Sequence, residues 1–167
     1  EWRDGAGGGK SKEERRLASG CETRRKGETT RRRVNLAYGR GGPAAAIRII
    51  PPRVRSIEEL GLPPVLKELA ARRSGLFLVT GPSGSGKSTT LAAMIEEINA
   101  SRAVHIVTIE DPVEYVFEPR RALIHQREAG RDTSGFAEAL RRAMRQDPDV
   151  IMIGELRDAE TVSAAVS

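Results

Sequence analysis

The stretch LFLVTGPSGSGKSTTLAAMIEEINA, residues 76–100, holds an apolar run, a glycine-rich loop and a helix-like segment in that order. The run LFLVT is continuous and apolar, which is typical of a strand buried in a parallel sheet. Glycines at 81, 84 and 86 would weaken any regular element, so their density indicates a backbone that something must approach closely. A strand, a tight loop and a helix in this order favour an α/β fold.

The loop fits the phosphate-binding pattern G-x-x-x-x-G-K-[ST], which ends here in Gly86-Lys87-Ser88. Such a loop turns backbone N–H groups inward, and the helix that follows adds the positive end of its dipole. We expect Lys87 to reach the β- and γ-phosphates, Ser88 to ligate Mg²⁺ and Thr89 to lie near the α-phosphate. The alternative interpretation is a chance glycine-rich turn. The expected nucleotide-binding residues are Gly81, Pro82, Ser83, Gly84, Ser85, Gly86, Lys87, Ser88 and Thr89.

Acidic residues follow two further apolar runs. The cluster EDPVE, residues 110–114, comes directly after VHIVTI, and Glu155 follows DVIMIG. Carboxylates at the C-terminal end of a parallel strand face the crevice where ligands bind, although a polar turn is the alternative for 110–114. The second run resembles a Walker B pattern, so Glu155 is a candidate to orient or deprotonate an attacking water, and a solvated loop acid is the alternative. The candidate catalytic residues are Glu155, Lys87, Glu110 and Glu114, and Asp111 and Glu155 are candidates to hold Mg²⁺ through water.

The remaining segments suggest strands alternating with helices, which predicts a parallel sheet with helical crossovers. A capping-box pattern at residues 56–59 predicts the start of a short helix, and Asp158 is placed to cap a last helix that starts at Ala159. Further strands are expected at 33–38, 44–50, 103–109 and 149–153, and further helices at 63–73, after the loop to about Asn99, and at 135–146. The expected organisation is a disordered basic tail at 1–32, a domain remnant at 33–50, a linker with helices at 51–74 and an incomplete core at 75–167.

Charge and composition narrow the function classes. The net charge of +5 lies within residues 1–33, which hold 11 Lys or Arg and 6 Asp or Glu, whereas residues 34–167 are balanced. A solvated tail is the favoured interpretation, and binding of nucleic acid is a weaker alternative because the tail has no recognisable binding motif. One cysteine, Cys21, excludes a disulfide framework. We expect neither a secretory signal nor a transmembrane segment, and therefore a cytoplasmic protein.

Four stretches together resemble the ATPases of type IV pili and type II secretion. They are GLFLVTGPSGSGKSTTLAAM, TIEDPVEYVFE, QREAGRD and FAEALRRAMRQDPDVIMIGELRD, and the third favours the retraction motors of the PilT type. The resemblance covers about residues 33–167. It implies an α/β, RecA-like P-loop NTPase core with a parallel sheet, preceded by the last strands of a PAS-like N-terminal domain.

The resemblance also implies a function and its partners. The family hydrolyses ATP with Mg²⁺ in a homo-hexamer that works on an inner-membrane pilus platform, so we expect a cytoplasmic subunit peripheral to the inner membrane. Residues 110, 111 and 114 would form the acidic box of the family, and Glu155 its Walker B glutamate. Members also bring arginines to the nucleotide, for which Arg33, Arg40 and Arg48 are candidates.

The chain departs from the family pattern at both ends. Most of the N-terminal domain and the family's histidine box are not within these residues, so the segment is expected to hydrolyse ATP weakly or not at all by itself. Retraction of a type IV pilus in twitching motility is the favoured function. The alternatives are a pilus-extension or secretion ATPase, a nucleotide-binding domain without hydrolysis, and the basic-tail nucleic-acid binder.

Overall fold

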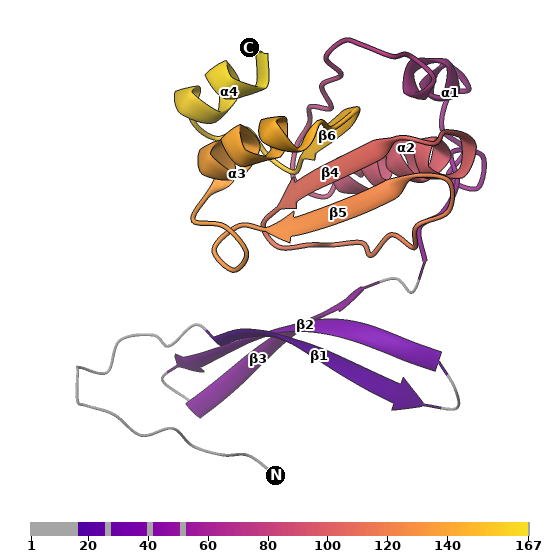
Figure 1. Cartoon of the computed structure of the whole chain (residues 1–167). Helices are drawn as coiled ribbons and strands as arrows, with labels where there is room; N and C mark the ends of the chain where they lie inside the picture. The colour runs from indigo at the N-terminus through magenta and orange to yellow at the C-terminus, as the bar shows by residue number, and fades with distance from the viewer. Residues whose placement is uncertain (1–16, 26–27, 40–41, 51–52, 167) are drawn as a thin grey trace. The chain divides into compact units, whose positions relative to one another are not determined.

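The computed structural model describes residues 17–25, 28–39, 42–50 and 53–166. Two compact units divide the chain, Glu1–Pro52 and Arg53–Ser167. The first contains three strands, and the second contains the glycine-rich loop and both acidic clusters (Figure 1).

The first unit is an antiparallel sheet of β1 (Leu17–Arg25), β2 (Glu28–Gly39) and β3 (Gly42–Ile50), in the order β1-β2-β3. Val34 is opposite Ile47 and Leu36 is opposite Ala45 in the register of β2 with β3. Because side chains alternate along a strand, these four lie on one face of the sheet. The strands expected at 33–38 and 44–50 are therefore present, and each is longer than expected.

The expectation of a disordered tail up to residue 32 is corrected for residues 17–25 and 28–32, which lie in β1 and β2. The sequence argument relied on a missing apolar period, but an antiparallel ladder satisfies backbone N–H and C=O groups without apolar side chains. The backbone register places residue 23 opposite residue 30, and both are threonine, a residue type that favours strands. The PAS-like interpretation of this unit stays a prediction.

The second unit has a parallel sheet of β4 (His105–Glu110), β5 (Leu123–Glu128) and β6 (Val150–Ile153), in the order β5-β4-β6. Strands β4 and β6 match the runs expected at 103–109 and 149–153. Strand β5 was not expected, because LIHQRE has two apolar residues followed by four polar ones and so shows neither an apolar run nor strict alternation. The expected parallel α/β sheet is confirmed.

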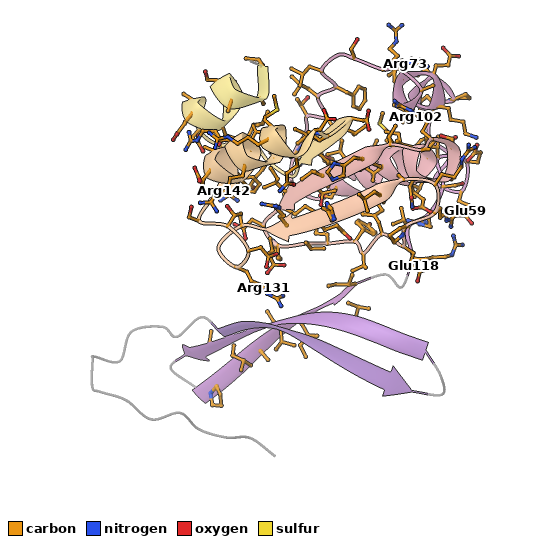
Figure 2. All side chains as sticks on the ribbon, viewed as in Figure 1. Glu59, Arg73, Arg102, Glu118, Arg131 and Arg142 are labelled. Carbon is orange, nitrogen blue, oxygen red and sulfur yellow. The ribbon has the colours of Figure 1, made fainter. Side chains whose placement is uncertain are left out.

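Helices cover both faces of this sheet. Ile106 of β4 packs in a cluster with α1 (Val65–Ala70) and α2 (Lys87–Ser101), and Val107 packs in a second cluster with α3 (Phe136–Ala143). Partly buried alanines of α4 (Ala159–Val166) join the second cluster. Ile106, Val107 and Ile109 are all fully buried, as expected for a central strand covered on both sides. In Figure 2, labelled charged residues such as Arg73, on the outside of the helical layer near α1, lie away from these clusters.

The expected buried strand at 76–80 does not form. Residues 75–80 have no regular secondary structure, and Leu76 and Leu78 are more than half exposed. An apolar run becomes a buried strand only where a sheet edge accepts its backbone. Within the described residues β6 pairs with β4 alone, and no described strand bridges from β6 to this run.

Two helix caps follow the sequence closely. Ser56 and Glu59 bond reciprocally, each side chain accepting from the other's backbone N–H at 3.2 and 2.9 Å, respectively. The box closes a turn at 57–61 rather than the expected helix, because Gly61 adopts φ 64° directly after it. Asp158 caps α4 as expected, and its carboxylate accepts from the backbone N–H and the hydroxyl of Thr161 at 2.7 and 3.0 Å. Helix α3 continues as the 3₁₀ turn η1 (Met144–Gln146) to the expected end at 146.

Candidate nucleotide-binding site

The phosphate-loop residues take backbone conformations that other residues rarely adopt. Gly81, Gly84 and Gly86 have φ of 150°, 79° and 92°. At Gly81 a side chain would be strained by the positive φ, and its Cβ would lie 2.8 Å from the Ser85 hydroxyl oxygen, which would have to move. Gly86 is the N-cap of α2, and the helix therefore begins at Lys87, as the motif predicts. The loop is thus joined to a helix N-terminus, where anions are favoured.

The Lys87 side chain folds back over the loop. Its ammonium donates to the backbone carbonyls of Gly81 and Pro82 at 2.9 and 2.8 Å, and the residue is half-buried. The amine therefore lies beside the loop rather than extended into solvent. Its expected contact with the β- and γ-phosphates stays a prediction.

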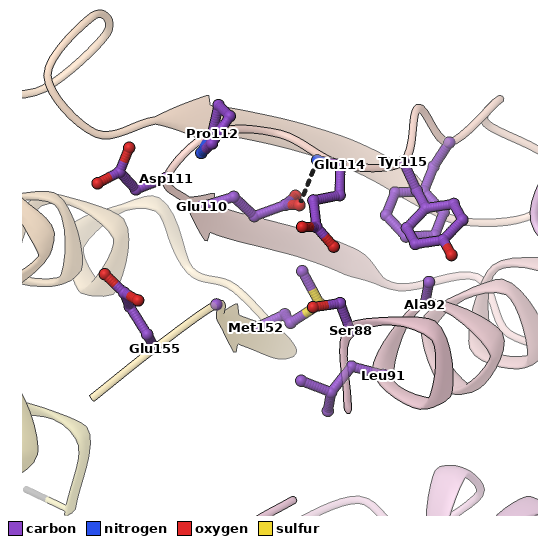
Figure 3. A pocket seen from close by; sticks show the side chains of 12 residues that line it. Ser88, Leu91, Ala92, Glu110, Asp111, Pro112, Glu114, Tyr115, Met152 and Glu155 are labelled. Atoms are coloured by element: carbon purple, nitrogen blue, oxygen red, sulfur yellow. Dashed lines mark hydrogen bonds between the residues drawn. The ribbon is translucent and has the colours of Figure 1, made fainter. Parts of the chain in front are cut away.

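Residues from three separate segments line one cavity. Ser88 comes from the first turn of α2, Glu110, Asp111 and Glu114 come from the end of β4 and the loop after it, and Glu155 comes from the end of β6. Figure 3 shows Ser88 and the carboxyl group of Glu114 facing each other, with Glu155 on the Asp111 side of the cavity. The carboxyl ends of β4 and β6 meet here because parallel strands share one edge. The five expected Mg²⁺-site and catalytic residues outside the glycine loop are brought together.

Glu110 is buried and fully engaged. Its Oε1 accepts from the Thr108 hydroxyl at 2.7 Å and from the Gln126 amide at 3.2 Å, and its Oε2 accepts from the backbone N–H of Glu114 at 3.2 Å (Figure 3). Burial raises the pKa of Glu110, and the same hydrogen bonds oppose that rise. In this arrangement Glu110 holds the loop after β4, so its expected catalytic role stays a prediction.

Two contacts connect the other candidates. Glu155 accepts from the Arg157 guanidinium at 2.8 Å, and the arginine side chain is largely exposed. Thr89 shares a hydrogen bond of 3.0 Å with the Tyr115 hydroxyl, which links the first turn of α2 to the loop after β4. Thr89 is therefore directed toward that loop, and its expected place beside the α-phosphate is untested.

The three candidate arginines belong to the first unit. Arg33 of β2 is opposite Arg48 of β3 in the sheet register, and Arg40 lies outside the described residues. Because the two units are described separately, the expected contacts of these arginines with nucleotide stay predictions.

Sequence reasoning missed three residues that build the site. Thr108 and Gln126 bind Glu110, and Tyr115 binds Thr89. Thr108 could have been found, because it interrupts the apolar run of β4 two residues before Glu110 and so lies on the same face. Gln126 could not, because β5 itself was not expected.

No three His, Cys, Asp or Glu side chains in the described part of the chain are grouped closely enough to hold a metal by themselves. Hydroxyl and carboxylate oxygens, which Mg²⁺ prefers, are the donors around the cavity.

Fold and loop together define an α/β protein that carries a phosphate-loop motif ahead of a helix, with acidic residues at the carboxyl ends of two neighbouring strands. Comparison with known families is consistent with this class: the model of the type II/IV secretion system protein family matches residues 14–167. The chain belongs to that family. The match begins well before residue 33, so β1 lies within the family region and not in an unrelated tail.

The most similar relatives include two proteins of pilus motility. The type IV pilus retraction ATPase PilT of Pseudomonas aeruginosa is 52% identical over 135 residues, which are 81% of this chain and 39% of that protein. The twitching motility protein of Neisseria gonorrhoeae is 52% identical over 135 residues, 81% of this chain and 36% of that protein. A crystal structure of the pilus retraction motor PilT with bound ADP matches with TM-score 0.81 and 51% identity, over 89% of this chain and 43% of that one. The chain thus spans about two fifths of these relatives.

No helix among the described residues is long and apolar enough to cross a membrane.

Proposed function

We propose that this chain is the nucleotide-binding part of an ATP-hydrolysing motor subunit that retracts type IV pili. One observation carries the proposal: Ser88 of the phosphate-loop helix and the acidic residues that end β4 and β6 line a single cavity. The relatives named for pilus retraction and twitching motility support the choice of motor. The structural relative that holds ADP supports a nucleotide as ligand.

The residues of this chain divide the chemistry among them. The glycine loop and the start of α2 bind the phosphates through backbone N–H groups. Lys87 moves from the loop carbonyls onto the β- and γ-phosphates and neutralises charge there. Glu155 orients a water for in-line attack on the γ-phosphorus and accepts its proton.

The donor set fits Mg²⁺. Ser88 would hold the ion directly, and Asp111 and Glu155, which line the same cavity, would hold it through water. When bound, Mg²⁺ supplies charge stabilisation on the transferring phosphoryl group. Glu114 faces Ser88 and adds a further carboxylate on this side (Figure 3).

A titration of ATP into this chain in the presence of Mg²⁺ tests the binding half of the proposal. Lys87→Ala is expected to abolish measurable binding, because the ammonium contacts the transferring phosphates. Lys67→Ala is the matched control, because Lys67 lies on α1, pairs with Glu58 and does not line the cavity. Equal affinity in the Lys87→Ala variant and the wild type would contradict the loop assignment.

Hydrolysis is tested in a full-length protein that contains this segment. Glu155→Gln is expected to bind ATP normally and to lose turnover by about 10²–10⁴-fold, the usual contribution of a positioned general base. Phosphate release in single turnover separates the two effects. Normal turnover in this variant would move the role to Glu110 or Glu114.

A homo-hexameric ring, an inner-membrane platform as partner and a cytoplasmic place at that membrane complete the proposal. Their support is membership of the secretion family and the pilus motors among the relatives. The mass of the full-length protein with and without ATP, measured by light scattering, tests the ring.

A further inference from the structure

Gln126 of β5 uses its whole side-chain amide. Its Nε2 donates to Glu110 Oε1 at 3.2 Å and to the Tyr115 carbonyl at 2.8 Å, and its Oε1 accepts from the Phe117 N–H at 3.0 Å. The residue is half-buried, so these groups are partly removed from water. A primary amide presents two donors and an acceptor in one plane, and all three are used here.

Two of the three partners of Gln126, Tyr115 and Phe117, belong to one segment, residues 111–117, which we call the acidic loop. It follows β4, has no regular secondary structure, and carries Asp111 and Glu114 into the wall of the cavity that Ser88 also lines. A loop without strand or helix needs other partners for its backbone N–H groups. In the acidic loop these are side chains: Gln126 for Phe117, Glu110 for Glu114, and Glu128 for Val113 at 3.1 Å.

Of these three side chains, Gln126 is the one that contacts both the acidic loop and Glu110 at the end of β4. It binds the acidic loop at Tyr115 and Phe117, and it also binds Glu110, which in turn holds Glu114. Tyr115 continues the chain of contacts to α2 through its hydroxyl and Thr89. The amide therefore stands between β5, the end of β4 and the loop that faces the phosphate-loop helix.

We propose that Gln126 is a positioning residue that fixes the acidic loop so that Glu114 faces Ser88 and Asp111 lines the same cavity. The inference rests on the proposed nucleotide site for its consequence, and on the contacts of Gln126 for its mechanism. Gln126 touches neither nucleotide phosphates nor water in this role. It acts through Glu110 and through the backbone at 115 and 117.

Two substitutions separate the contacts. Gln126→Leu removes all three hydrogen bonds at similar volume. Gln126→Glu keeps the acceptor for the Phe117 N–H, but it removes both donors and places a carboxylate beside Glu110. Gln146→Leu is the matched control, because Gln146 is exposed and lies in η1, where it makes no part of the cavity wall.

Amide hydrogen exchange on this chain reads the position of the loop without any ligand. In the Gln126→Leu variant, exchange at Phe117 and Glu114 is expected to accelerate at least about fivefold, the factor that the loss of one ordinary hydrogen bond gives. In the Gln126→Glu variant, Glu114 accelerates while Phe117 stays protected. Exchange in β4 and α2 stays at the wild-type rate in both, and Gln146→Leu changes neither amide.

Measuring the affinity for ATP with Mg²⁺ and with a chelator then tests whether the position of the acidic loop affects the proposed Mg²⁺ site. The gain in affinity that Mg²⁺ gives is expected to fall about tenfold in the Gln126→Leu variant, because residues that orient metal ligands typically contribute on that scale. Affinity in chelator, which reports the phosphate loop alone, stays unchanged. A general loss of structure would lower both affinities together.

The outcomes are distinct. Unchanged exchange at Phe117 and Glu114 in a folded Gln126→Leu variant overturns the inference, and so does an unchanged Mg²⁺ gain with accelerated exchange. If Gln126→Leu unfolds, the split between Phe117 and Glu114 in Gln126→Glu decides in its place. Failure of the wild-type chain to bind ATP in either condition overturns the proposed function, while the exchange data still decide whether Gln126 fixes the loop.

Discussion

Glu110 shows how one residue can hold a candidate site together through its hydrogen bonds. It ends a fully buried strand, where a carboxylate is costly unless hydrogen bonds compensate. Three donors surround it, from Thr108, Gln126 and the backbone of Glu114. The pKa of Glu110 is nevertheless raised, first because of burial and in part because Glu114 lies nearby. One of the hydrogen bonds that offset the cost of burying Glu110 comes from the acidic loop, so the charge of Glu110 and the position of that loop depend on each other.

A change of pH tests that balance through Glu110→Gln. A raised pKa in the folded chain means that ionisation of Glu110 costs stability, and this cost grows as pH rises past the ordinary carboxyl value of 4.5. The variant cannot ionise, so its stability relative to the wild type is expected to improve between about pH 4 and about pH 7. Urea unfolding of both proteins at each pH measures the difference, in which the other titrating groups cancel. A difference that is constant with pH would contradict the assignment.

The residues of the glycine loop and of the two acidic clusters could be predicted, because each group is recognised from residues close together in the sequence. Their partners could not. Tyr115 reaches Thr89, 26 residues away in the sequence, only after the chain has folded, and no spacing rule predicts that pair. For the candidate site, the sequence thus predicts which residues line the cavity better than it predicts how they are held.

Among the elements, α4 depends most visibly on one residue. Asp158 accepts two hydrogen bonds from Thr161, and these lower the pKa of Asp158 below its usual value. Thr161 itself is buried, so the cap fixes the helix start against the second core cluster.

Asp158→Ala is expected to accelerate amide exchange in the first turn of α4, because the N–H of Thr161 loses its partner. Asp158→Asn keeps one acceptor oxygen, so its exchange rate in α4 is expected to lie between those of Asp158→Ala and the wild type. Since the pKa is lowered in the folded chain, the contribution of the cap is present above the ordinary value of 3.8 and is lost as pH falls through the lower folded value. Exchange in α4 that is equal in all three proteins would contradict this account.

Elements whose stability comes from local signals were predicted best. The helix after the loop and α3 follow apolar spacing, α4 follows its Asp158 cap, and β4 and β6 follow apolar runs. Elements that depend on distant partners were predicted worst. The run at 76–80 has the apolar composition of a buried strand, but no described strand pairs with it. Strand β1 lacks that composition, but it pairs with β2.

At the scale of the second unit, the core is divided by β4, whose alternate residues serve the two helical layers. Ile106 packs with the α1 and α2 side, and Val107 and Ile109 pack with the α3 side. The unit therefore has one central strand on which both halves of its apolar core depend.

Ile106→Ala tests this dependence. The side chain is fully buried, so the variant is expected to lose about 2–5 kcal/mol of unfolding free energy, from lost burial and from the cavity left behind. Leu123→Ala on β5 is the control, because Leu123 is 54% exposed and its truncation should cost within about 0.5 kcal/mol. Urea unfolding followed by circular dichroism measures both. Similar losses in the two variants would argue against a core centred on β4.

The hydrogen bonds of Lys87 have a consequence for the energetics of ligand entry. Two carbonyl dipoles of the same loop already stabilise its charge. In the proposed function, a polyphosphate would therefore replace these carbonyls as the partner of the ammonium and would not bind a fully hydrated cation. The contribution of Lys87 to the binding free energy is then the difference between its bonds to phosphate and its bonds to the two carbonyls. The same two hydrogen bonds fix the directions of the Gly81 and Pro82 carbonyl groups, so less loop entropy remains to be lost when a ligand binds.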